Sequence, residues 1–167
     1  MAQKAFYSFY FKQDSHRVSQ VKQMGVIEGQ PILSSNEWEE VEKGGDKAIE
    51  DWIVKEMKGK SCVVVLIGSS TAGRRWVNYE ITKAWNDEKG VVGVYIHNLK
   101  NLAGLQSSKG DNPFTGITIK GSGKKLSSIV KAYDPPYTIS TNVYDHIKTN
   151  LESWVKEAIK IRKDFTG

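Results

Sequence analysis

An apolar run with no polar residue in it constrains the fold of this chain more than any other feature. Residues 63–67 read Val-Val-Val-Leu-Ile, and residues 91–96 form a second run of the same kind. A strand with one face in water alternates apolar and polar side chains, whereas a strand covered on both faces does not. The two runs therefore predict inner strands of a parallel sheet that has helices on both faces.

Extended and helical segments alternate along the rest of the chain, which predicts an α/β domain with a doubly wound parallel sheet. The aromatic-rich residues 5–11 are expected to form the first strand, and 61–67 and 91–96 the next two. Helices are expected from Asp14 or Ser15 to about Met24, over 37–42, from Asp46 to about Met57, from the loop 68–71 to near Gly90, and from Thr141 or Asn142 onward. Residues 97–123 predict a long loop. Because the chain has 167 residues, one domain spanning 1–167 is expected.

Composition narrows the class of protein. Cys62 is the sole cysteine, which excludes an intramolecular disulfide and a multi-cysteine zinc site. His16, His97 and His146 stand far apart in the sequence, and no metal site is expected. No apolar run reaches the roughly 20 residues that span a bilayer, and the N-terminus lacks the pattern of a signal peptide. A cytoplasmic protein without membrane association is expected.

The charge is unevenly distributed along the chain. The formal net charge is +5, but residues 28–56 carry nine acids against three lysines, whereas residues 100–131 carry six lysines against Asp111 alone. Such patches steer an anionic ligand, favour head-to-tail self-association, or are simply solvated faces. Sites for single-stranded nucleic acid interleave aromatic rings with basic residues. Phe114 is the only aromatic residue of 100–131, so a nucleic-acid partner is not expected.

Glu80 is the main candidate for chemistry. It lies in the early turns of the helix that follows the strand 61–67 and the Gly-Ser-Ser-Thr loop 68–71. In open α/β sheets, ligands bind beyond the carboxyl ends of the strands, where such loops begin, so Glu80 is placed to meet a ligand. Spacing alone also fits, and by itself favours, a solvated glutamate on the polar face of an amphipathic helix.

Several segments resemble the NAD-cleaving TIR domains, and above all those of the bacterial Thoeris anti-phage defence family. Residues 5–9 resemble the first TIR strand, and residues 38–48 the entry to the second helix. Residues 67–81 resemble the Trp-x-x-x-Glu segment, with Trp76 and Glu80 at its fixed positions, and 109–114 carry the Asn-Pro-Phe loop. The resemblance covers about 4–114 and implies a flavodoxin-like three-layer sandwich with a central parallel sheet. The alternation of elements alone also fits a response-receiver domain.

The resemblance implies an enzyme whose substrate is NAD+, with no further cofactor. Nicotinamide is already a cationic leaving group and needs no general acid, and Glu80 would act as the catalytic residue by stabilising the ribosyl cation that remains. Glu80 is expected to be partly exposed, in a cleft near Tyr10 and Phe11. The pocket is expected to be lined by Tyr10, Phe11, Trp38 and Trp76. The product would be an ADP-ribose-derived signalling nucleotide, cyclic or conjugated, that a separate effector protein senses.

The sequence departs from the pattern of this family at two places. Many TIR enzymes carry a basic residue where Tyr10 and Phe11 stand, and Ser where Gly68 stands. These departures leave the contacts to the nucleotide unassigned.

Two other functions remain open at the level of the sequence. One is a non-enzymatic TIR-type module that signals by assembly, because a surface glutamate at position 80 is compatible with it. The other is a nucleoside deoxyribosyltransferase-like enzyme, which uses a carboxylate nucleophile on a similar sheet. Turnover of NAD+ compared with turnover of nucleosides separates the three.

Overall fold

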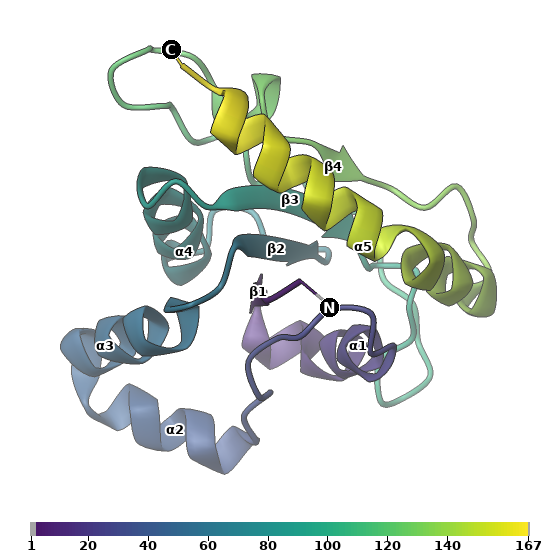
Figure 1. The fold of residues 1–167 in the computed structure, drawn as a ribbon. Coiled ribbons are helices and arrows are strands. Elements are labelled where there is room, and N and C mark those ends of the chain that lie inside the picture. The colour runs from purple at the N-terminus through teal and green to yellow at the C-terminus, as the bar shows by residue number, and fades with distance from the viewer. Residues whose placement is uncertain (1–2, 167) are drawn as a thin grey trace.

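The computed structural model describes residues 3–166. Within them, the strands β1 (Ala5–Ser8), β2 (Cys62–Ile67), β3 (Gly90–Tyr95) and β4 (Ala132–Tyr133) form one parallel sheet in the order β1-β2-β3-β4 (Figure 1). A single parallel bridge joins Lys4 to Glu28 on the outer side of β1. If the segment at Glu28 is counted as a rudimentary second strand, the strand order is 2-1-3-4-5, the flavodoxin-like order. The predicted fold class is confirmed.

The inner strands have no face in contact with water. All six residues of β2 and all six of β3 are buried, and the strands pair from Cys62 opposite Gly90 to Ile67 opposite Tyr95. This burial explains why the two apolar runs do not alternate. The prediction drawn from them is confirmed, with bounds that differ by one residue.

Five α-helices are described between residues 3 and 166, and they form the outer layers (Figure 1). They are α1 (Phe11–Gln23), α2 (Ser35–Lys43), α3 (Gly45–Met57), α4 (Arg75–Asn86) and α5 (Ser140–Asp164). One face of the sheet packs on α1 and α5, and the other packs on α3 and α4. The helix α2 contacts α3, and none of its own residues is buried. It therefore lies outside the three layers, as a flap beside the sheet edge.

The first strand is shorter than the sequence predicted. It ends at Ser8, not at residue 10 or 11, because α1 begins at Phe11 rather than at Asp14 or Ser15. Tyr10 precedes α1 in an extended conformation. The aromatic residues that the sequence assigned to a strand therefore stand at the start of a helix, next to the carboxyl end of the strand.

The start of α4 also differs from the prediction. The helix begins at Arg75 rather than within the loop 68–71, and Arg74 precedes it. The hydroxyl of Thr71 does not cap the helix. It accepts a hydrogen bond of 2.8 Å from the backbone N–H of Gly68 and so closes the loop. By contrast, Ser34 does cap α2, through a reciprocal capping box with Glu37.

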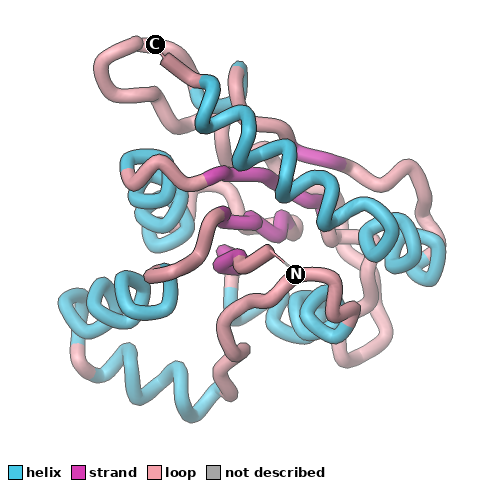
Figure 2. The backbone as a smooth tube through the Cα atoms, in the orientation of Figure 1, coloured by secondary structure: helices cyan, strands magenta, loops and turns pink. Residues whose placement is uncertain are grey.

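The predicted long loop is confirmed. Residues 96–125 contain no helix or strand, and a short 3-10 helix, η1 (Leu126–Ser128), follows before β4 (Figure 2). Arg17 anchors the first part of the loop, because its side chain donates hydrogen bonds of 2.9 Å to the carbonyls of Leu99 and Leu105. Across residues 3–166, no helix is both long and apolar enough to cross a membrane.

Candidate active site

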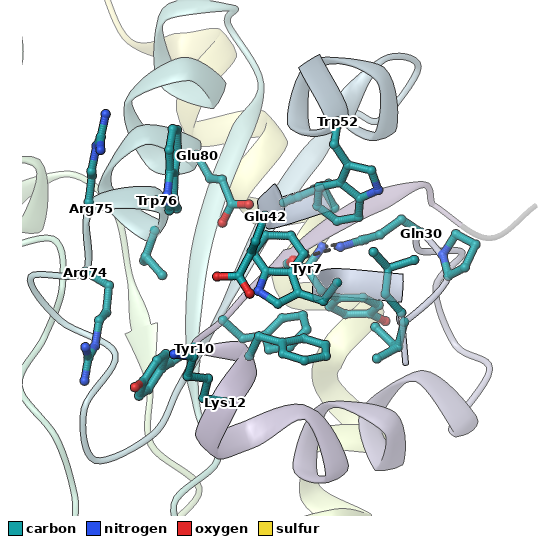
Figure 3. A pocket seen from close by; sticks show the side chains of 18 residues that line it. Tyr7, Tyr10, Lys12, Gln30, Glu42, Trp52, Arg74, Arg75, Trp76 and Glu80 are labelled. Carbon is teal, nitrogen blue, oxygen red and sulfur yellow. Dashed lines mark hydrogen bonds between the residues drawn. The ribbon is translucent and has the colours of Figure 1, made fainter. Parts of the chain in front are cut away.

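A cavity of about 180 Å³ opens at the carboxyl end of β1, between the starts of α1 and α4 and the helices α2 and α3 (Figure 3). Most of its lining residues are aromatic or aliphatic, and a few polar side chains project into it. Such a combination is typical of small-molecule sites. The cavity lies where ligands bind in open α/β sheets, beyond the carboxyl ends of the strands.

Glu80 lies in this cavity and is buried. The residue is 7% exposed, and the hydroxyl of Ser8, the last residue of β1, donates a hydrogen bond of 2.6 Å to Glu80 Oε1. The predicted position in a cleft at the carboxyl end of β1 is confirmed. The predicted partial exposure is wrong, because α4 packs closely against the sheet and brings the carboxyl group over the end of the strand.

The environment of Glu80 favours its neutral form. Burial raises the pKa of the Glu80 carboxyl from 4.5 to about 8, and the hydrogen bond from Ser8 partly opposes that rise. The neutral carboxylic acid is therefore the favoured form of Glu80 at neutral pH. An acid with so strongly shifted a pKa inside a cavity marks a candidate functional group.

Aromatic rings from three helices form part of the cavity wall. Trp38 of α2 lies 5.7 Å from Phe11 of α1 and 5.7 Å from Trp52 of α3, measured between ring centroids. Trp52 in turn meets Phe6 of β1 edge to face at 6.1 Å. Trp38 thereby attaches the otherwise exposed α2 to the body of the domain, and it covers one side of the cavity.

The mouth of the cavity carries positive charge. The guanidinium group of Arg74 lies 3.7 Å from the centroid of the Tyr10 ring, and that of Arg75 lies 4.6 Å from the Trp76 ring. Arg75 is also paired with Asp46 of α3 at 2.7 Å. Tyr10, which occupies a position where many TIR enzymes carry a basic residue, thus has a basic group stacked on it from another part of the chain.

The structure brings together all five residues that the sequence predicted for the site. Glu80, Tyr10, Phe11, Trp38 and Trp76 line the same cavity (Figure 3). Their roles in binding and catalysis stay predictions.

Several lining residues were missed by the sequence interpretation. Gln30 is bonded to the backbone N–H and carbonyl of Tyr7 at 2.9 Å each, so its amide stands in for a neighbouring strand. Glu42 of α2 points into the cavity, and Arg74 and Lys12 lie at its mouth (Figure 3). No local pattern signals these positions. The segment at Glu28 pairs with β1 through a single bridge, at Lys4. It therefore leaves the backbone of Tyr7 without a strand partner, and the Gln30 amide takes that place.

His97, the other residue noted at the carboxyl edge of the sheet, lies outside this cavity. It borders a separate, shallow hollow with Asn98 and Asp134. Burial lowers the pKa of its imidazole, which favours the neutral ring. Across residues 3–166, no group of three or more His, Cys, Asp or Glu side chains is arranged to hold a metal ion.

Comparison with known proteins adds independent information. The family model of the TIR-like domain of Thoeris protein ThsB matches residues 6–101. A candidate cyclic ADP-D-ribose synthase, ThsB1 of Bacillus cereus (strain MSX-D12), is 33% identical over 133 residues, which cover 75% of this chain and 69% of the relative. Every residue that lines the cavity lies within the stretch that the family model matches.

Proposed function

The chain belongs to the TIR-like domain family of Thoeris protein ThsB, and from this premise we propose that it cleaves NAD+, releases nicotinamide and forms cyclic ADP-ribose. The observation that carries the proposal is the buried Glu80 carboxyl on the floor of an aromatic cavity. The name of the Bacillus cereus relative supports the cyclic product.

Cleavage of NAD+ needs one negative charge beside the ribose, in a site from which water is excluded. When the bond between C1′ of the ribose and the nicotinamide nitrogen breaks, the electron pair leaves with nicotinamide, which becomes neutral, and positive charge develops on the ribose. An ionised Glu80 stabilises that charge. The substrate itself favours ionisation, because a nearby positive charge lowers the pKa of a carboxyl group.

The aromatic wall supports cyclisation over hydrolysis. Water that reaches the ribosyl cation gives open ADP-ribose, whereas a nitrogen of the adenine base in the same molecule gives a cyclic product with loss of a proton. Trp38, Phe11 and Trp52 restrict the entry of water and offer ring faces to a cationic nicotinamide. The site thus protects the cation until its own adenine arrives.

The biological setting follows from the family rather than from the geometry. We infer that the chain acts in the cytoplasm, where NAD+ is available, as part of an anti-phage response. A separate effector protein senses the product. Self-association of the chain stays a prediction, which the opposite charges of 28–56 and 100–131 support.

The test compares the purified protein with its Glu80→Gln variant. Both are incubated with NAD+, alone and with an extract of phage-infected cells, and nicotinamide and nucleotide products are measured by mass spectrometry. Gln keeps the size of Glu and an oxygen that accepts from Ser8, but it removes the charge. We expect nicotinamide release to fall by about 10²–10³-fold, and Glu39→Gln on the exposed face of α2 serves as the control.

Each other outcome points to a different conclusion. If Glu80→Gln releases nicotinamide at the wild-type rate, the mechanism is wrong. If nucleosides are cleaved and NAD+ is not, the chain is a deoxyribosyltransferase-like enzyme. If the wild type turns over neither substrate under either condition, the interaction-module hypothesis replaces the enzyme.

A further inference from the structure

The mouth of the cavity holds a fixed guanidinium group without an acidic partner. Arg74 is exposed, yet its Nε donates a hydrogen bond of 2.9 Å to the carbonyl of Ser70 and its plane lies 3.7 Å over the ring of Tyr10. Among the ion pairs formed within residues 3–166, none includes Arg74. Its two terminal nitrogens therefore remain available as donors to a ligand.

The neighbouring Arg75, by contrast, has an acidic partner and a structural role. Its guanidinium group is paired with Asp46 at 2.7 Å, which ties the start of α4 to the start of α3. Both arginines border the cavity and both are exposed. One is engaged by a carboxylate, and the other is held in place only by a carbonyl and an aromatic ring.

A second cation lies at the same mouth. Lys12, in the first turn of α1, is exposed, lines the cavity, and takes part in none of the ion pairs within residues 3–166. Figure 3 shows Arg74, Tyr10 and Lys12 grouped on one side of the cavity, with Glu80 farther in. Tyr10 and Arg74 each precede a helix that has no side-chain cap, α1 and α4 respectively. The partial positive charge of both helix starts adds to that of the two side chains.

Two carboxyl groups also line the cavity. Glu80 is buried and Glu42 is exposed, and Figure 3 shows both carboxyl groups directed into the cavity. The site therefore offers carboxyl groups to a cation as well as basic groups at its mouth. A ligand that fits this pattern carries a cation at one end and an anion in its middle, as NAD+ does with its nicotinamide and its diphosphate.

From this arrangement we propose that Arg74, stacked on Tyr10 and assisted by Lys12, is a binding site for the diphosphate of a dinucleotide. The inference rests on the proposed function and deepens it, because it names the feature that separates a dinucleotide substrate from a nucleoside. Charge-assisted hydrogen bonds from a guanidinium fork suit phosphate oxygens in geometry as well as charge. The stacking on Tyr10 fixes the side chain before the ligand arrives, which lowers the entropy lost on binding.

The experiment measures binding without catalysis. The purified protein is titrated by calorimetry with ADP and with adenosine, which lacks the diphosphate, at low and high salt. We expect ADP to bind the wild type more tightly than adenosine does. Arg74→Gln should lower the affinity for ADP by about tenfold or more and leave the affinity for adenosine unchanged. Arg75→Gln removes the same charge from the next position and is expected to bind ADP within about twofold of the wild type. Higher salt is expected to lower the affinity for ADP more than the affinity for adenosine.

Arg74→Lys keeps the charge without the planar fork, so its ADP affinity should lie between those of the wild type and Arg74→Gln. The proposal is overturned if Arg74→Gln binds ADP like the wild type, if adenosine binds the wild type as tightly as ADP, or if Arg75→Gln loses as much affinity. Since ADP has no nicotinamide, the result is independent of turnover. A normal ADP response in a protein that never releases nicotinamide overturns the proposed function alone, whereas turnover that survives Arg74→Gln with an unchanged KM overturns the diphosphate site alone.

Discussion

The burial of Glu80 predicts how the stability of the fold depends on pH. In the folded protein the pKa of this carboxyl is raised from 4.5 to about 8, with desolvation as the main cause. Between these two values the folded state holds a proton that the unfolded chain has released. The stability linked to Glu80 is therefore fully present below about 4.5 and is lost as the pH rises through about 8. Glu80→Gln removes this ionisation and should abolish the associated loss.

The expected size follows from the pKa values. Each unit of pH between them lowers the free energy of unfolding by about 1.4 kcal/mol. From about pH 5 to about pH 8 the wild type should lose at most about 4 kcal/mol through this group. A loss of that size is a large part of the 5–15 kcal/mol or so typical of small domains. The Gln variant should therefore become more stable than the wild type at alkaline pH.

The assay is urea denaturation of both proteins at about pH 5, pH 7 and pH 9. Other titrating groups, such as the buried Asp14, contribute equally to both proteins, so the difference between the two curves isolates Glu80. Glu39→Gln, on the exposed face of α2, should give a curve parallel to that of the wild type. If the difference in free energy of unfolding between wild type and Glu80→Gln does not change with pH across this range, Glu80 titrates as a surface glutamate. The raised pKa of a buried acid is then wrong.

Two substitutions test the surroundings of the site. Ser8→Ala removes the hydrogen bond that holds the pKa of Glu80 down, so the pH midpoint of nicotinamide release should move to higher pH; a profile of kcat against pH that does not move contradicts the role of Ser8. Gly68→Ala would place a methyl group 2.1 Å from Oδ2 of the buried Asp14, and urea denaturation should show a loss of about 1–3 kcal/mol. Gly116→Ala, where a Cβ meets nothing within 4 Å, is the control and should change stability little.

The layers of the fold could be predicted because burial leaves a direct mark on sequence. The runs of β2 and β3 lack alternation for the same reason that all their residues are buried. The end of β1 could not be placed in this way. Phe9, Tyr10 and Phe11 have the aromatic character of a strand, but their rings are needed around the cavity rather than in the sheet. A propensity that reflects packing does not distinguish these two environments.

The site could be predicted in part. Residues close together in the sequence could be assigned to it, whereas contacts between distant segments could not. Glu80 and Trp76 share one helix, so their spacing places them on one face. The contact between Ser8 and Glu80 joins positions 72 residues apart, and no local pattern announces it. Gly68 is similar: the sequence shows a glycine in place of the usual Ser, and the structure shows that the Asp14 carboxylate fills the space of a side chain. The roles of such residues can be recognised only from the three-dimensional structure.

Burial of Glu80 connects the stability of the fold to the proposed reaction. An unpaired charge on the buried Glu80 would be costly, and the raised pKa of this carboxyl favours its neutral form at pH 7. A cationic ligand reverses the balance, because its charge lowers the pKa of a nearby carboxyl. The low dielectric that favours the neutral acid also strengthens its attraction to a ribosyl cation once it ionises. Glu80 therefore ionises when a cationic substrate binds beside it, and until then its neutral form avoids the cost of an unpaired buried carboxylate.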